Sequence, residues 1–195
     1  MPGSPRRLPR LPVLVASVLI VGGLAACSGG PAPSPAPTTA APTESADEPI
    51  FASDEEALAA AVEAYEAYNS LASEITADPS RDAAEIARVA DESTVPQFEE
   101  DIEALRAAGL RIVGNVSLSG AKLAERSEDA SRATVAIYVC RDVSDTRVLD
   151  KEGNDVTKPD RASQQPQLAT LVSSPSEPRQ LIVKDLERWQ DDNVC

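Results

Sequence analysis

The feature that most restricts how this chain folds is a proline-rich tract near its N-terminus. Residues 28–49 contain six prolines among Ala, Ser, Thr and Gly, and they show no apolar periodicity. A segment of this composition cannot bury enough apolar surface to fold, and alternating Pro-Ala and Pro-Ser favours an extended polyproline geometry. We therefore expect one folded domain, over residues 51–195, with the tract as its tether.

The residues before the tract have the pattern of an export signal. Residues 1–10 carry three arginines, and residues 11–26 form an apolar run that ends in Leu24-Ala25-Ala26-Cys27. The run is shorter than the ~20 residues that a helix needs to span a bilayer. A positive N-terminal region followed by a short apolar segment is typical of a signal peptide.

Leu24-Ala25-Ala26-Cys27 resembles the lipobox of bacterial lipoproteins. The resemblance implies that residues 1–26 are removed and that Cys27 becomes a lipidated N-terminus carrying acyl chains such as palmitate. Each buried CH₂ of such chains adds about 0.8 kcal/mol to membrane retention. The implied location is the extracytoplasmic face of the cell membrane, with residues 27–50 as lipidated linker. Ordinary signal-peptide cleavage and a retained membrane anchor are the alternatives.

Charge and composition exclude several functions. The net charge is −14, and residues 1–26 hold three arginines and no acid, so the remainder carries 15 basic and 32 acidic side chains, or −17. Such a surface repels phosphate backbones, and we expect no nucleic-acid binding. The chain has no histidine, which removes His-dependent nucleophiles and His-ligated metals. We expect no cofactor and no metal.

The cysteines predict one disulfide. With Cys27 assigned to lipid, Cys140 and Cys195 remain, and an even number in an exported protein favours a bridge. Closing a loop of this length contributes roughly 4 kcal/mol in the chain-entropy model, as an upper figure. The alternative is two buried free thiols.

A long amphipathic helix is expected over residues 54–76. Ser53 and Glu56 have the spacing of a capping box, and apolar residues then recur at three- and four-residue steps. Tyr65 and Tyr68 lie three apart on the apolar face. They either pack in the core or line a pocket.

Two shorter helices and a series of strands follow. Asp78 and Pro79 have the pattern of a helix start, and a further helix is expected over residues 95–108 with Gly109 as its C-cap. Beyond Gly109 the apolar period becomes two. Strands are expected over residues 112–120, 131–141, 146–149, 168–173 and 180–189. Residues 152–155 predict a turn. A calcium-binding loop starting at Asp150 is the alternative, but that motif needs glycine at its sixth position and Gly153 is at the fourth.

Helices followed by closely connected strands predict an α+β fold, with the N-terminal helices packed on a curved antiparallel sheet of about four to five strands. This element order over residues 53–195 is similar to that of the nuclear transport factor 2-like cone fold. The resemblance implies a cavity at the wide end of the cone, in a fold class that includes ligand binders, isomerases and scaffolds.

The candidate pocket residues are Tyr65, Tyr68, Tyr138 and Asp142. An isomerase of the steroid type needs a carboxylate base and a hydrogen-bonding tyrosine, and Tyr138 and Asp142 match by residue type alone. No nucleophile motif is present, so no catalytic residue is assigned. We expect a membrane-anchored domain that binds a cell-envelope protein or a small apolar ligand without catalysis. A cofactor-free acid/base enzyme is the alternative.

Overall fold

The computed structural model describes residues 49–190 and Cys195. The predicted signal peptide, Cys27 and nearly all of the linker lie outside the described residues. The elements in chain order are α1 (Asp54–Ala77), the 3₁₀ helix η1 (Ala83–Arg88), α2 (Val95–Ala107), β1 (Arg111–Val113), β2 (Ser117–Glu128), β3 (Ala133–Asp142), β4 (Arg147–Leu149), β5 (Gln164–Ser173) and β6 (Leu181–Arg188).

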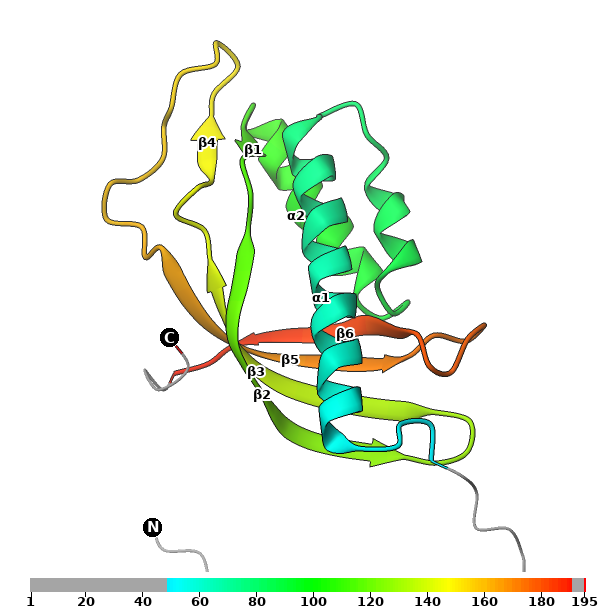
Figure 1. Ribbon diagram of the computed structural model, residues 1–195. Helices are drawn as coiled ribbons and strands as arrows, with labels where there is room; N and C mark the ends of the chain where they lie inside the picture. Colours follow the sequence, from blue (N-terminus) through cyan, green and yellow to red (C-terminus); the bar gives the residue numbers. More distant parts are fainter. Residues whose placement is uncertain (1–48, 191–194) are drawn as a thin grey trace, which may run out of the picture. The chain divides into compact units, whose positions relative to one another are not determined.

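The strands form two antiparallel sheets. One has four strands in the order β2-β3-β5-β6, and the other pairs β1 with β4. In Figure 1, α1 crosses one face of the four-stranded sheet, and the β1–β4 pair rises beyond that sheet beside the upper part of α1. The predicted α+β class, with helices packed on an antiparallel sheet, is confirmed.

The core lies between α1 and the face of the four-stranded sheet that it covers, here called the inner face. Strand β3 shows why: Val135, Ile137 and Val139 are fully buried, while the side chains between them are half-exposed. Alternate residues of a strand point to opposite faces, so these three belong to the inner face. The helix contributes Ala57, Ala61, Ala64, Tyr65, Tyr68, Leu71 and Ile75. The result is an aliphatic, alanine-rich core.

The first helix begins as its sequence predicts. The Glu56 N–H donates to Ser53 Oγ (3.2 Å), and Glu56 Oε2 accepts from the Ala52 N–H (2.7 Å). The bond to Ser53 Oγ is the N-cap half of a capping box and satisfies one backbone donor that helix geometry would leave free. The Glu56 carboxylate reaches one residue further back than that motif requires, to Ala52 in place of Ser53. The helix then runs to Ala77, one residue beyond the predicted end.

The prediction of a second α-helix starting at Asp78 is wrong. The Asp78 carboxylate accepts hydrogen bonds from the Ser80 N–H and hydroxyl, which closes a local turn in place of a helix start. The chain forms only η1, after Asp82 accepts from the Ala84 N–H (3.0 Å).

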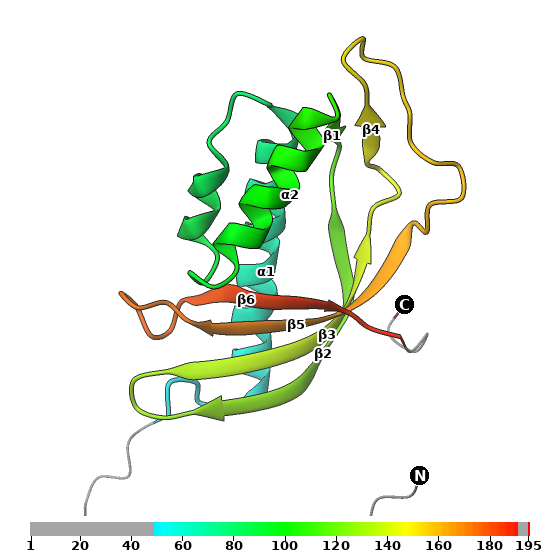
Figure 2. The same ribbon diagram turned by 180° about the vertical axis from the view of Figure 1, so that it is seen from behind.

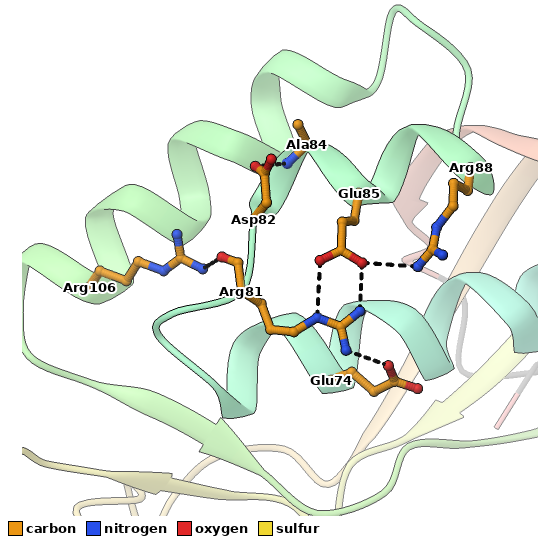
Figure 3. Close-up of polar contacts among 7 residues, drawn as sticks. All are labelled: Glu74, Arg81, Asp82, Ala84, Glu85, Arg88 and Arg106. Atoms are coloured by element: carbon orange, nitrogen blue, oxygen red, sulfur yellow. Dashed lines mark hydrogen bonds and ion pairs between the residues drawn. The ribbon is translucent and has the colours of Figure 1, made fainter.

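An arginine-centred ion-pair network ties η1 to the two α-helices (Figure 3). Arg81 Nη1 lies 2.9 Å from Glu74 Oε2 on α1, and its Nη2 lies 2.7 Å from Glu85 Oε2 on η1. Arg106 on α2 donates through Nη2 to the Arg81 carbonyl oxygen (2.6 Å). Because these side chains are partly exposed to solvent, we infer that their contacts position the helices relative to one another.

The predicted strand over residues 112–120 is wrong, because the segment divides between β1 and β2 in different sheets. Gly114 marks the break: its φ is +107°, and a Cβ there would lie 2.1 Å from the Asp145 carbonyl oxygen. Only glycine accommodates both the conformation and the close approach. Strand β2 then continues to Glu128 as an edge strand, through polar residues that no predicted strand covered.

The remaining boundaries need smaller corrections. β5 begins at Gln164, four residues before the strand expected over residues 168–173. The turn expected over residues 152–155 is present, with Gly153 at φ +87° and the Asp150 carboxylate accepting from both nitrogens of Asn154. Within residues 49–190, no helix has the length and apolar character needed to cross a membrane.

Candidate functional site

The inner face of the sheet changes from apolar to polar along β3 and β5. After Val139 the next inward position on β3 is Arg141. In the strand register Val139 lies opposite Gln167 on β5, and Arg141 lies opposite Gln165. We call this end of the sheet the polar end; it consists of the last residues of β3 and the first residues of β5. It places three hydrogen-bonding side chains beneath α1.

A hydrogen-bond network joins the polar end to α1. The Tyr65 hydroxyl donates to Gln167 Oε1, and Asn69 Nδ2 donates to the Tyr65 carbonyl oxygen (3.0 Å). Arg141 Nε donates to Asn69 Oδ1 (3.2 Å), and Arg141 Nη1 donates to Gln165 Oε1 (3.0 Å). The guanidinium of Arg141 is thus held between one helix and one neighbouring strand.

Tyr65 and Tyr68 pack in the core. Tyr65 is fully buried, and burial raises its pKa to about 12 although the Arg141 charge acts in the opposite direction. Burial also raises the pKa of Tyr68, whose ring packs edge-on against Phe98 with centroids 6.2 Å apart. Both hydroxyls therefore stay protonated at neutral pH, where Tyr65 donates a hydrogen bond from the border of the core.

A cavity of about 280 Å³ lies beside Arg141. The last turns of α1 and the β1–β4 pair line part of it, and residues of the loop after β3 and of the loop before β5 line the rest. Its apolar lining is Ala72, Ile112, Gly114, Val116, Val143 and Val148, and its polar lining is Ser73, Thr76, Arg141, Thr146, Arg161 and Gln165. Of the residues that the structure describes, no carboxyl-bearing one lines this cavity.

Arg161 fixes one wall of the cavity. Its Nη1 donates to Thr146 Oγ1, and its Nη2 donates to the carbonyl oxygens of Val143 and Thr146, each at 2.9 Å. Thr146 is itself buried, and its hydroxyl donates to the Val143 carbonyl oxygen (2.8 Å). These bonds hold the segment between β3 and β4 in place.

The two cavity arginines are among the six of the eleven arginines in residues 49–190 that form no ion pair. Over residues 49–190, neither Arg141 nor Arg161 has a carboxylate within ion-pairing distance. Ion pairs are formed elsewhere by Arg81, Arg88, Arg126, Arg147 and Arg179. The cavity is therefore a positively charged site in an acidic protein.

The structure does not bring the four predicted pocket residues together. Tyr138 lies on the opposite, outer face of the sheet, with its ring centroid 4.7 Å from that of Trp189. Asp142 ends β3, where the Ser144 N–H donates to its carboxylate (2.8 Å) and hydrogen bonding lowers its pKa. The pairing of Tyr138 with Asp142 as acid/base groups is therefore not assembled.

The outer face also carries the cysteine pair. Cys140 is almost completely buried, and Cys195 lies at disulfide-bonding distance from it with the Cα atoms 5.0 Å apart. This is the geometry that the predicted bridge requires. The bridge would close the outer side of the polar end, directly next to Arg141 in the chain.

Comparisons with known proteins do not assign a family. No protein-family model and no curated protein matches the chain. Among solved structures, the intermembrane space region of the chloroplast protein ARC6 is similar with a TM-score of 0.45 at 13% identity, covering 69% of this chain and 97% of that one. A likeness of this degree carries no functional argument, so function is argued below from the site itself.

Proposed function

We propose that this chain is a lipid-anchored binding protein on the extracytoplasmic face of the cell membrane, and that its α+β domain binds a small ligand in the cavity beside Arg141. The observation that carries the proposal is the cavity itself. Ligand sites are typically concave, mostly apolar and equipped with a few placed polar groups, in volumes of roughly 300–1,000 Å³. At about 280 Å³ this cavity suits a small ligand.

The position of the cavity supports a binding site that is held away from the anchored end of the domain. The described chain enters the domain at the N-terminal end of α1, whereas Ala72, Ser73 and Thr76 line the cavity from the last turns of the same helix. At 1.5 Å per residue, Ala72 lies about 27 Å along the helix axis from Asp54. Figure 2 shows the β1–β4 pair at the end of α1 opposite to the chain entry. The anchored end and the site are thus far apart.

The contents of the cavity favour binding over acid/base catalysis. A general base must lie within hydrogen-bonding reach of the proton that it abstracts. The cavity lining drawn from residues 49–190 includes no carboxyl group, and Tyr138 lies on the other face of the sheet. What the cavity offers is fixed hydrogen-bond donors and apolar walls, which are the components of a binding site.

The anchor is tested by replacing Cys27 with Ser in the full-length chain. We expect loss of radiolabelled palmitate incorporation and a shift of the protein from the membrane to the soluble fraction or to an unprocessed precursor. Cys140→Ser is the matched control, because it removes a cysteine outside the lipobox and should keep the label. A Cys27→Ser protein that fractionates and migrates like wild type contradicts the anchor.

Ligand binding is tested by methyl NMR on the full-length protein in lipid nanodiscs. Sodium hexanoate and 1-hexanol serve as probes, and both should shift the methyl resonances of Ile112, Val116 and Val148, which line the cavity. The methyls of Val156, which is exposed and outside the lining, should not move. The proposed binding site is rejected if neither probe shifts the cavity methyls.

A further inference from the structure

We infer that the ligand of this cavity is a short amphiphile with one anionic group, a carboxylate, and that Arg141 binds that group. The inference rests on the proposed ligand-binding function and specifies its chemistry. It is carried by the charge, the free hydrogen-bonding capacity and the shape of the cavity lining.

The charge of the lining is the first step. Two guanidinium groups and no carboxylate from the described residues line the cavity, although the chain has 32 acidic against 18 basic side chains. A partly buried charge without a counterion is costly, and proteins normally pair it. Five of the eleven arginines in residues 49–190 do so, and Arg141 and Arg161 are among the six that do not. Hydrogen bonding to Thr157 and, to a smaller extent, the charge of Arg161 lower the pKa of Asp155, so Arg161 has a carboxylate nearby outside the lining. Arg141 is the cavity charge for which an anionic ligand would supply the counterion.

Free donors are the second step. Arg141 uses Nε and Nη1 to bind Asn69 and Gln165, and its Nη2 has no hydrogen-bond partner within residues 49–190. A guanidinium has five donors in a fixed plane and matches the geometry of a carboxylate. Because two of its nitrogens are already held, the third is oriented before a ligand arrives, which lowers the entropic cost of binding.

Arg161 has a different part in this site. Its three hydrogen bonds to Val143 and Thr146 fix its side chain against the loop after β3. It therefore contributes positive charge to the lining without having to move. Arg141 is the binding residue, and Arg161 is a positioning residue that also raises the local potential.

The apolar walls determine the rest of the ligand. Ile112, Val116, Val143 and Val148 surround the charged side chains, and an inorganic anion would leave these walls without a partner. Liquid water occupies about 30 Å³ per molecule, so a cavity of about 280 Å³ corresponds to roughly nine non-hydrogen atoms. Short-chain fatty acids and small aromatic acids fall within this size.

A second cationic hollow fits an anion less well. It has a volume of about 460 Å³ and is lined by Pro79, Arg106, Gly109, Leu110, Arg111, Asp150 and Lys151. Lys151 is exposed to solvent, and Asp150 brings a carboxylate into the lining. An anion there would meet a like charge, so the cavity beside Arg141 is the better candidate.

The test compares three probes on the full-length protein in nanodiscs: sodium hexanoate, 1-hexanol and inorganic phosphate. We expect hexanoate to bind at least tenfold more tightly than 1-hexanol, measured by the shifts of the Ile112 and Val148 methyls. Phosphate should bind more weakly than hexanoate because it does not use the apolar walls. Empty nanodiscs correct for partition of the probes into lipid.

Variants assign the effect to Arg141. Arg141→Gln should weaken hexanoate at least tenfold and leave 1-hexanol unchanged. Arg88→Gln is the matched control, since it removes the same charge from an exposed residue that pairs with Glu85 outside the cavity. Ala72→Leu keeps the charge and fills part of the cavity, so it should weaken both organic probes.

Arg141→Lys keeps the inference testable if Arg141→Gln does not fold. It retains the charge and loses the planar group, and it should bind hexanoate with intermediate affinity. Circular dichroism and the methyl fingerprint establish that each variant is folded.

Each unfavourable outcome rejects a different statement. Equal binding of 1-hexanol and hexanoate in the cavity overturns the anionic ligand and leaves the proposed function standing. Phosphate that binds as tightly as hexanoate overturns the amphiphile. Absence of cavity shifts with both organic probes overturns this inference together with the proposed site.

Discussion

The two ends of the inner face are built from the same strands and the same helix, yet they are held together differently. At the apolar end, Val135, Leu171 and Val183 of the sheet and Ala57 and Ala61 of α1 are fully buried in one hydrophobic cluster. At the polar end, the side chains bond to one another and stand beside a cavity. The apolar end is stabilised by packing, and the polar end has space for a ligand.

The polar end therefore needs connections of another kind. Arg161 hydrogen-bonds the loop after β3 from the segment before β5, and the cysteine pair lies at the outer side of the same end, which a bridge would close. The comparison leads to a clear expectation. Changes at the apolar end should reduce stability alone, whereas changes at the polar end should alter both local order and binding.

The largest effect is expected at the outer side of the polar end. Replacing Cys140 and Cys195 together with Ser should lower the free energy of unfolding by about 4 kcal/mol, an upper figure from loop-closure entropy. Urea unfolding of the wild-type and double-variant proteins measures the loss. Alkylation of these thiols in the untreated wild-type protein, without prior reduction, would show that no bridge forms.

At the apolar end, Leu171→Ala should lower the free energy of unfolding by about 3 kcal/mol, because it opens a cavity in a fully packed site. Hexanoate affinity of the folded protein should not change. Val156→Ala is the surface control, with an expected effect within about 0.5 kcal/mol. If Leu171→Ala changes the affinity, the two ends are not independent.

Removing the hydrogen bonds of Arg161 should have a smaller and more local effect on stability. Arg161→Gln breaks three hydrogen bonds from a charged donor and should cost about 2 kcal/mol, with faster amide exchange in the loop after β3. Arg147→Gln on β4 is the matched control: its ion pair with Asp155 is exposed, and such pairs contribute at most about 1 kcal/mol. Equal losses in both variants would contradict the assigned role.

The border between the two ends should respond to pH through Tyr65. Its pKa is about 12 when folded against about 10 when unfolded. The unfolded state therefore loses its proton first, and stability is full below pH 10 and falls by about 1.4 kcal/mol per pH unit between the two values. Tyr65→Phe should flatten this part of the curve. An unchanged slope in the variant would assign the alkaline loss to other groups.

Local sequence signals predicted the elements that depend on local rules. The Ser53–Glu56 capping box and the apolar repeat located α1 to within one residue, and the alternation of β-branched residues located β3. These local signals did not predict that the expected strand over residues 112–120 is divided between β1 and β2. The division depends on the approach of Gly114 to the Asp145 carbonyl oxygen, which is a contact between distant parts of the chain.

The candidate site was missed for a similar reason. Gln165 and Gln167 precede the strand expected over residues 168–173, and only the pairing of β5 with β3 places them beneath α1. One signal was available for Arg141, because it continues the inward alternation of Val135, Ile137 and Val139. A charged residue at an inward strand position indicates a polar site at that end of a sheet. Arg161 offered no such signal, since its contacts depend on the path of a loop.

The entry of the chain into the domain has a mechanical consequence for the anchored protein that we propose. Phe51 is buried, its N–H donates to Glu128 Oε2 at the end of β2 (3.2 Å), and Arg179 Nη1 donates to the Ile50 carbonyl oxygen (2.6 Å). A pull on the chain ahead of these residues is therefore shared among α1, β2 and the turn before β6, and does not peel the helix away alone. The load enters at the firmly packed end, and the cavity lies off its path.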